Sequence, residues 1–484
     1  MLALVAAFFL WSGKRVPQLP KASQFVDLRS VEQSRRAACG SPRTDGRPVV
    51  IEMLYSNDKE EWIDAAASRF ARLCPNIQVR TTPLDAVDAA DAILSGEASP
   101  TIWSPANDLM IRYVEERWRD RRGSAPFDVR QQVSLVRSPL VVLIWEDRLA
   151  VLESILAQRR NGEGPWFEGM CAGVPRDPQG LDRMTLADMV PGTWIDWYNP
   201  AAPPSPTTPR WAARKADKKT RPAAYVPMFP TPEQIRQWGR VKLVHSSPTQ
   251  SEAGLAALYL MAYDYVLPPR ERPAALQAQI DAALAQPVKE ATIVRGDAAA
   301  ADFAKAFRER REPLGRWLRR CEAGLPPAID SSLLLTDEMF DVGPVRYDGV
   351  VTQEHLVFHL FGQISQHEDA MTELRVIYPN PTVLNEHPVV VLDDGRVSTE
   401  QREAAEKWIA FLRDAEMQKL AMTFGFRPAT PGFTLRGFED ARNPFMKFRR
   451  YGIEIDSPFI EPPRISGEIV HELIRTWQDA TGTN

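Results

Sequence analysis

Three times along the 484-residue chain, a short apolar stretch typical of a β-strand leads through a polar turn directly into a helical pattern. The pattern predicts strands followed by helices at 49–55 and 58–73, 101–103 and 108–118, and 241–245 and 252–265. Strands that alternate with helices predict an α/β fold with doubly wound parallel sheets. In such sheets the carboxyl ends of the strands meet at one edge, where helix N-termini present unpaired N–H groups and ligands bind.

Each of these turns carries hydroxyl or amide side chains, which are Ser56, Asn57, Ser104, Asn107, Ser246, Ser247, Thr249 and Ser251. Any single one could simply cap the helix that follows, because Ser, Thr and Asn are preferred N-cap residues. Asn57 with Glu60, and Ser398 with Gln401, also have the spacing of a capping box. Three such turns in one chain nevertheless favour a ligand site at the edge of the sheet.

The sequence motifs of common catalytic and cofactor sites are missing from this chain. It contains no GxSxG, HExxH, GxxxxGK[ST] or strand-linked GxGxxG motif. His355 and His359 have i, i+4 spacing beside Glu354, but no third ligand stands in register, so we assign no metal site. Because no catalytic triad can be assembled, and no cofactor is indicated, the sequence favours a protein that holds a ligand over an enzyme.

The composition is that of a soluble globular protein, since 44% of the residues are hydrophobic and 25% are charged. The length predicts roughly two to three domain-sized cores. The net charge of −4 and the lack of interleaved basic and aromatic residues give no reason to expect a nucleic-acid partner.

Residues 176–237 interrupt the α/β rhythm with a proline-rich stretch, in which basic residues cluster around the single acid Asp217: Arg210, Arg214, Lys215, Lys218, Lys219 and Arg221. We interpret it as a solvated surface loop, with a lid over a cleft or a docking patch for an acidic partner as alternatives. Further along, residues 398–424 predict one long amphipathic helix.

The N-terminus carries one strongly apolar segment, LALVAAFFLW at residues 2–11. It is shorter than the roughly 20 residues of a transmembrane helix and resembles the apolar region of a signal peptide. Lys14 and Arg15 follow it instead of preceding it, and no small-x-small cleavage site stands close behind. We expect an exported protein tethered by an uncleaved or truncated anchor, with its soluble part beginning between Ser23 and Gly46. A buried N-terminal strand is the alternative.

Five segments in order carry a family resemblance: PTIWSPANDLMI (100–111), VRSPLVVLI (136–144), VKLVHSSPTQSEAGLAALYLMAYDY (241–265), VRYDGVVTQEHLV (345–357) and STEQREAAEKWIAFLRDAEMQKLAMTFGFRPA (398–429). They resemble bacterial extracellular solute-binding proteins of the molybdate-binding-like branch, often associated with von Willebrand factor A domains. The resemblance implies the type 2 periplasmic-binding fold, in which two doubly wound α/β lobes are joined by two crossover strands and close on a ligand.

The resemblance also implies a division of the chain into four parts. Residues 1–48 would form the anchor or signal segment and a leader. Residues 49–137 and 353–484 would form lobe one, and residues 138–352 would form lobe two, including the proline-rich insertion. The crossover strands would lie near 140–145 and 348–353.

Ligand contacts carried over from the family fall on Ser56, Asn57, Ser104, Asn107, Ser138, Thr249, Ser251 and Glu354. Glu252 stands at the N-terminus of the third helix, where its charge would satisfy the helix dipole and repel an oxyanion. With Asp348 and Glu354 in the inferred cleft, a neutral or partly cationic solute is favoured over molybdate or sulfate.

These features predict an extracytoplasmic protein that captures a small molecule or ion for an ABC transporter or a sensor. The alternative is a ligand-independent scaffold or accessory protein of the cell envelope on the same fold, with a von Willebrand-type partner. An enzyme built on this fold is the third reading.

The four cysteines, Cys39, Cys74, Cys171 and Cys321, have no CxxC spacing, which argues against a zinc site. Cys39 precedes the first strand and Cys74 ends the first helix, so both can lie at the same end of lobe one. If any disulfide forms, we expect it to join these two residues.

Overall fold

The computed structural model describes residues 39–40, 45–160, 193–198, 229–268, 271–285, 292–366, 373–379, 381–393, 395–438, 442–456 and 458–483. The apolar segment 2–11 lies outside these residues, as does the basic part of the insertion at 210–221. No helix in the described ranges is both long and apolar enough to cross a membrane.

A five-stranded sheet organises the first lobe. Its strands run in the order β2 (Ile77–Pro83), β1 (Val49–Tyr55), β3 (Ile102–Ser104), β11 (Pro388–Val391) and β4 (Val133–Ser134). The neighbours β2, β1 and β3 are parallel, whereas β11 runs antiparallel to β3 and β4. The first two predicted strand–turn–helix units therefore place their turns at one edge of this sheet.

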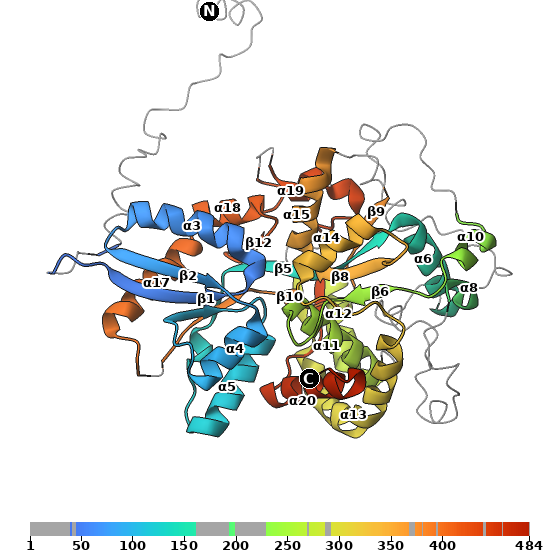
Figure 1. The fold of residues 1–484 in the computed structure, drawn as a ribbon, viewed down its shortest axis with the longest axis horizontal. Coiled ribbons are helices and arrows are strands. Elements are labelled where there is room, and N and C mark those ends of the chain that lie inside the picture. The colour runs from blue at the N-terminus through green and yellow to red at the C-terminus, as the bar shows by residue number, and fades with distance from the viewer. Residues whose placement is uncertain are drawn as a thin grey trace, which may run out of the picture.

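Helices cover both faces of the first sheet (Figure 1). They are α3 (Glu60–Leu73), α4 (Ala86–Ser95), α5 (Asp108–Arg122), α17 (Thr399–Leu412) and α18 (Ala415–Thr423). Helix α3 packs against α17 through aromatic contacts, with ring centroids of Phe70 and Trp408 5.0 Å apart. The predicted helix at 398–424 is two helices, because Asp414 caps α18 by accepting from the N–H groups of Glu416 and Met417.

The second lobe is built on strand β5 (Val136–Trp145). Strand β5 pairs with β10 (Leu384–Asn385), β8 (Gly349–Gln353), β9 (Leu374–Ile377) and β12 (Arg427–Pro428), and β6 (Leu243–His245) pairs with β8. Helix α11 (Glu252–Val266) is buried along its entire length against this sheet. Strands β7 (Ile293–Arg295) and β13 (Phe459–Glu461) form a separate two-stranded sheet. The remaining helices are α6 (Glu146–Arg160), α8 (Trp194–Trp197), α10 (Pro232–Gln237), α12 (Ala274–Leu284), α13 (Ala300–Glu322), α14 (Ser332–Val342), α15 (Glu354–Gln363), α19 (Pro444–Lys447) and α20 (Gly467–Thr481).

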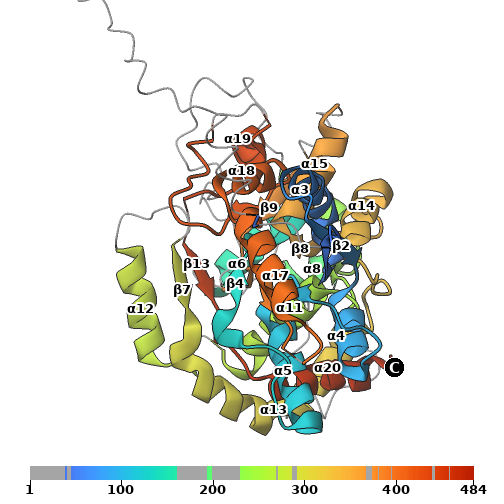
Figure 2. The same cartoon turned by 90° about the vertical axis from the view of Figure 1, so that its left-hand side faces the viewer.

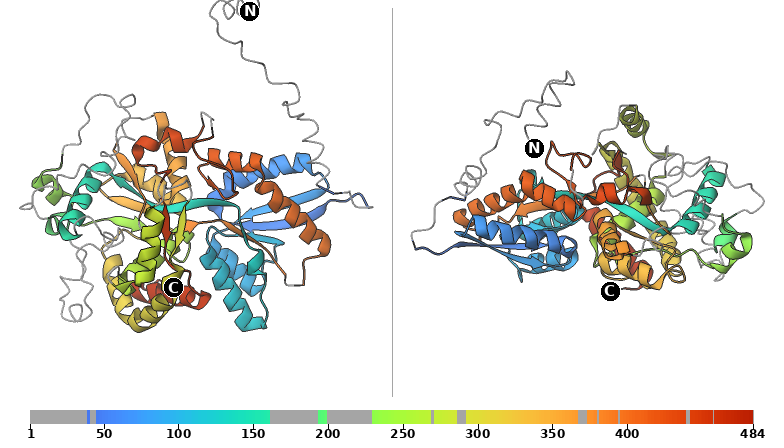
Figure 3. Two further views of the ribbon diagram at one scale, coloured as in Figure 1. Left: turned by 180° about the vertical axis from the view of Figure 1, so that it is seen from behind. Right: turned by 90° about the horizontal axis from the view of Figure 1, so that it is seen from above.

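The fold is thus the expected two-lobed α/β architecture, and the two sheets lie side by side (Figure 3). The chain enters the second sheet between β4 and β5 and returns to the first between β10 and β11. Our sequence-based boundary at residue 353 differs from this pairing, since α15, β9 and β10 belong with the second sheet. Helix α15 packs its apolar face on β5, and both β9 and β10 pair with β5.

The C-terminal helix α20 lies between the lobes (Figures 1 and 2). It packs against α5 of the first lobe and α13 of the second. Its buried face includes Ile469, Leu473 and Trp477. A Cβ at Gly467 would come within 2.2 Å of the carbonyl oxygen of Arg112, so the first turn of α20 approaches the backbone of α5 as closely as only glycine permits. This helix joins the lobes into one continuous core.

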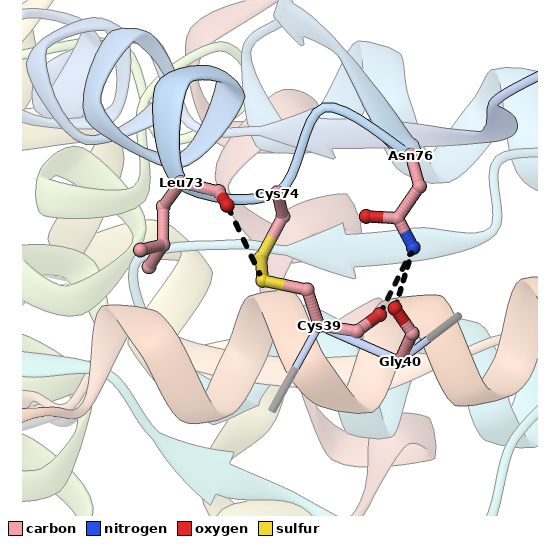
Figure 4. Close-up of a disulfide and its surroundings, with 5 residues drawn as sticks. All are labelled: Cys39, Gly40, Leu73, Cys74 and Asn76. Carbon is pink, nitrogen blue, oxygen red and sulfur yellow. Dashed lines mark hydrogen bonds between the residues drawn. A yellow bond between two sulfur atoms is a disulfide. The ribbon is translucent and has the colours of Figure 1, made fainter. Parts of the chain in front are cut away.

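The predicted disulfide is confirmed, because Cys39 and Cys74 are bonded with their Cα atoms 5.4 Å apart (Figure 4). The Asn76 side chain donates to the carbonyl oxygens of Cys39 (3.1 Å) and Gly40 (3.4 Å), which ties the leader to the end of α3. Cys321 is disulfide-bonded as well, so the protein carries more than this one bridge.

Candidate functional site

A cavity of about 160 Å³ opens between the two lobes. The first lobe contributes Ser56, Asn57, Asp58, Glu60, Asp85 and Ala86, and the second contributes Ser251, Glu252, Ser331, Ser332, Leu333 and Gln353. These residues come from the ends of β1 and β8 and from the first turns of α3, α4, α11 and α14. Figure 2 shows α4 and α14 on the same side of the molecule.

The first-lobe wall forms where β1 ends. Ser56 stays next to the end of β3 because its N–H donates to the carbonyl oxygen of Ser104 (3.1 Å). The expected capping box between Asn57 and Glu60 does not form, since residues Asn57–Lys59 make a 3-10 turn and α3 begins only at Glu60. The capping box of Ser398 and Gln401 is confirmed.

The second-lobe wall is held by three serine hydroxyls. Ser251 Oγ lies 2.9 Å from Ser246 Oγ and 2.6 Å from Ser332 Oγ, and Ser246 and Ser332 are 2.8 Å apart. This cluster ties the N-terminus of α11 to that of α14. Gly254 allows it, because a Cβ there would stand 2.2 Å from the carbonyl oxygen of Ser246.

Three of the eight predicted ligand residues, Ser56, Asn57 and Ser251, line this cavity. Ser104, Asn107 and Ser138 are buried and do not line it. Thr249 lies on the loop before α11, where its hydroxyl bonds that of Ser247 (3.0 Å). Their role in ligand binding stays a prediction.

Two carboxylates that we expected in the cleft are engaged elsewhere. Glu354 is fully buried and accepts two hydrogen bonds of 2.7 Å from Arg427. Asp348 accepts from Arg148 Nε (2.9 Å), Trp194 Nε1 (2.9 Å) and the Lys242 N–H (2.7 Å). Both carboxylates therefore stabilise the second lobe and are not among the cavity-lining residues.

Glu252 links the two lobes directly. Its carboxylate accepts hydrogen bonds from the Ala106 N–H, at 2.7 Å to either oxygen, and from the Asn107 N–H at 3.2 Å. Asn107 is the N-cap of α5 and Ala106 precedes it, so the carboxylate lies at the end of α5 that carries partial positive charge. Burial and the negative charge of Asp58 raise the pKa of the Glu252 carboxyl. We expected the Glu252 carboxylate to interact with the N-terminus of its own helix, α11. It instead accepts hydrogen bonds at the N-terminus of α5 in the other lobe.

Lys59 is a buried cation below the cavity, with a side chain 1% exposed. Its amine donates to Ser56 Oγ (2.7 Å) and to the carbonyl oxygens of Ser104 (2.7 Å) and Pro105 (3.3 Å). Burial lowers the pKa of this amine, against the opposing charges of Asp58 and Glu252. No sequence signal marks this role, because a lysine is usually exposed.

Two histidines lie at the crossing between the lobes. His355 Nδ1 lies 2.9 Å from Ser138 Oγ and its Nε2 lies 2.9 Å from the carbonyl oxygen of Asp58. Burial lowers the pKa of His355 to about 4 and that of His387 well below its usual value. His359, which we considered as a partner of His355 in a metal site, instead bonds Gln363. Within the described ranges, no three His, Cys, Asp or Glu side chains are grouped to hold a metal ion.

Several buried polar atoms around the site have no hydrogen-bond partner in the described part of the chain, namely Ser104 Oγ, Gln353 Oε1, Asn385 Nδ2 and His387 Nε2. Gln353 lines the cavity, and its Nε2 donates to Asp58 Oδ2 (2.7 Å). Its Oε1 is therefore the free end of this side chain, and it can only accept.

Comparison with known proteins gives one family match. The sequence model of a family described as bacterial extracellular solute-binding protein matches residues 51–427. No curated protein matches the sequence.

Among solved structures, the chain is similar to the ferric binding protein from Campylobacter jejuni, with 10% identity, a TM-score of 0.46, and coverage of 89% of this chain and 99% of that one. It is also similar to iron-bound HitA from Pseudomonas aeruginosa, with 10% identity, a TM-score of 0.43 and coverage of 90% and 98%. The sulfate-binding protein SubI from Mycobacterium tuberculosis has 13% identity, a TM-score of 0.36 and coverage of 88% and 96%. At these scores the likenesses carry no argument about the ligand.

Proposed function

The chain belongs to the family of bacterial extracellular solute-binding proteins, and on that premise we propose that it captures a small solute in the cavity between its lobes. It does so outside the cytoplasmic membrane and delivers the solute to an ABC transporter or a sensor. We further propose that the segment at residues 2–11 tethers it to the membrane, which cell fractionation tests by finding the full-length chain with the membranes.

The observation that carries this proposal is that both lobes line one cavity, mainly with polar residues. A solute that contacts Asn57 on one wall and Ser331 on the other favours the closed arrangement over an open one, because it gains contacts only when the lobes are together. Binding therefore changes the shape that a permease or a sensor meets.

The same geometry supports binding rather than catalysis. Ser138 is the one hydroxyl among the described cavity and crossing residues that contacts a histidine ring, His355. Ser138 is fully buried, and its oxygen already accepts the His355 N–H (3.2 Å), so a substrate has no approach to it. We propose that the protein has no enzymatic activity.

Native mass spectrometry of gently purified protein tests the proposal. We expect a retained small-molecule mass that is lost on mild denaturation. Ser331→Ala should reduce its retention, whereas the control Ser466→Ala should not. Both serines cap helices in the same way, through bonds of 3.4 Å to the Leu334 N–H and 3.3 Å to the Ile469 N–H, so each variant loses a cap worth about 1 kcal/mol. A protein that retains no solute, and that no solute in a broad screen stabilises, would contradict solute capture.

A second candidate function is a ligand-independent scaffold of the envelope with a von Willebrand-type partner. The Glu252 contact and the packing of α20 favour it, because both hold the lobes together without a solute. Small-angle scattering and thermal unfolding together separate the two candidates. Solute capture predicts that an added solute changes the radius of gyration or the unfolding temperature, and the scaffold predicts that neither changes.

A further inference from the structure

Resting on the proposed function, we infer that the solute is a small organic cation whose N–H groups bind the carboxylates and the free amide oxygen of the interlobe cavity. The cavity wall formed by the first lobe carries Asp58, Glu60 and Asp85, and Glu252 faces them from the second lobe. None of the described residues that line the cavity is basic. The wall therefore offers negative charge and hydroxyl groups to a ligand.

Acidic charge is concentrated around Asp85 in particular. Burial is the largest cause that raises the pKa of its carboxyl to about 6, and the charges of Asp88, Asp58 and Asp330 raise it further. Asp330 precedes α14 in the second lobe, whereas the other two belong to the first. Carboxylates that converge from both lobes repel one another unless a positive charge lies between them.

Two sets of donors beside the cavity that could bind an anion are already used. The N–H groups at the start of α5 are bound to the carboxylate of Glu252. The buried amine of Lys59 is directed at Ser56 Oγ and at two backbone carbonyl oxygens. An oxyanion in the cavity would meet the carboxyl groups of Asp58, Glu60 and Asp85 and none of these donors.

Gln353 gives an independent indication of the ligand. Its side chain is 2% exposed, and its Oε1 has no hydrogen-bond partner among the described residues. The bond from Nε2 to Asp58 Oδ2 fixes the amide so that Oε1 is the acceptor. A buried acceptor without a donor is unfavourable, and a ligand N–H would satisfy it.

Amines and guanidines supply what this wall lacks, because a primary ammonium has three N–H donors and no acceptor, and an alkylguanidinium has five. Such donors reach acceptors that are spread over a cavity. A bare metal ion instead needs ligands gathered around one point, and the described residues contain no such group of three.

Isothermal titration calorimetry on the full chain tests this class with methylammonium, putrescine and guanidinium as probes. At least one should bind saturably. Uncharged 1,4-butanediol, which matches putrescine in length, and molybdate and Mg²⁺ should not bind.

The variants Glu60→Gln and Asp85→Asn should weaken the bound cation at least tenfold. The control Glu61→Gln removes an adjacent exposed carboxylate that does not line the cavity, and it should change the affinity less than twofold. The inference is overturned if none of the three cations binds, if butanediol, molybdate or Mg²⁺ binds as tightly, or if Glu60→Gln and Glu61→Gln have equal effects.

The outcome separates this inference from the proposed function on which it rests. A neutral or anionic solute retained in native mass spectrometry would leave solute capture standing and overturn the cation class. Retention of no solute of any charge would remove both.

Discussion

Replacing Glu252 with alanine should loosen the contact between the lobes, because its carboxylate joins α11 of the second lobe to the start of α5 in the first. The carboxylate accepts hydrogen bonds from the N–H groups of Ala106 and Asn107, which are buried just before α5. The helix itself offers these N–H groups no acceptor. The alanine variant removes the acceptor and leaves both donors unsatisfied.

The size of the effect follows from these bonds. Two buried donors without acceptors cost about 2–6 kcal/mol together, at about 1–3 kcal/mol each. Part of this is offset, because burial of the carboxyl is itself unfavourable and raises its pKa. We expect a net loss of about 2–4 kcal/mol in the free energy of opening this contact. Glu252→Gln keeps an acceptor oxygen and should lose only about 1 kcal/mol.

Amide hydrogen exchange followed by mass spectrometry measures this directly. In a peptide that covers residues 105–109, exchange should be at least about 30-fold faster in Glu252→Ala than in the parent, since about 1.4 kcal/mol corresponds to a factor of ten. Glu61→Ala, at an exposed position on α3, should leave it unchanged. If exchange in Glu252→Ala stays within about threefold of the parent, the carboxylate does not hold the lobes together and our reasoning is wrong.

Three further predictions concern stability. Cys39→Ser/Cys74→Ser opens a loop of 35 residues and should lower the urea-unfolding free energy by about 4 kcal/mol, and a loss below about 1 kcal/mol would contradict it. Gly254→Ala should destabilise the protein strongly, because the new Cβ meets the backbone of Ser246. Gly362→Ala has open space at its Cβ on α15 and should raise the free energy of unfolding by about 0.5–1 kcal/mol. Equal unfolding temperatures of the two variants would refute this. Burial lowers the pKa of His355 to about 4, so between pH 6.5 and pH 4 the unfolded chain binds more protons at this residue than the folded protein does. The resulting stabilisation is complete above pH 6.5 and is lost as the pH falls through 4. It amounts to at most about 3 kcal/mol, and His355→Gln should flatten the fall in unfolding free energy from pH 7 to pH 4; an unchanged slope would exclude His355 as its source.

The sequence alone determined the class of the fold, because strand and helix periodicity and capping are local properties of the chain. The turn after Tyr55, the capping box at Ser398 and the pairing of Cys39 with Cys74 all follow from neighbouring residues or from positions at the ends of adjacent elements. The ordered motifs likewise indicated the family that the comparison then matched over residues 51–427.

Tertiary structure alone decided which polar side chains meet. Asp58, Glu60 and Asp85 stand in or before the first turns of helices, where acidic residues are favoured for reasons unrelated to a ligand, so no sequence signal marks them as a cavity wall. Glu252 acts on the N–H of Ala106, 146 residues away, and Glu354 is neutralised by Arg427, 73 residues away. The lobe to which α15, β9 and β10 belong was likewise fixed by burial of an apolar helix face against β5. Such contacts depend on how whole elements pack, and periodicity within one element carries no information about its distant partner.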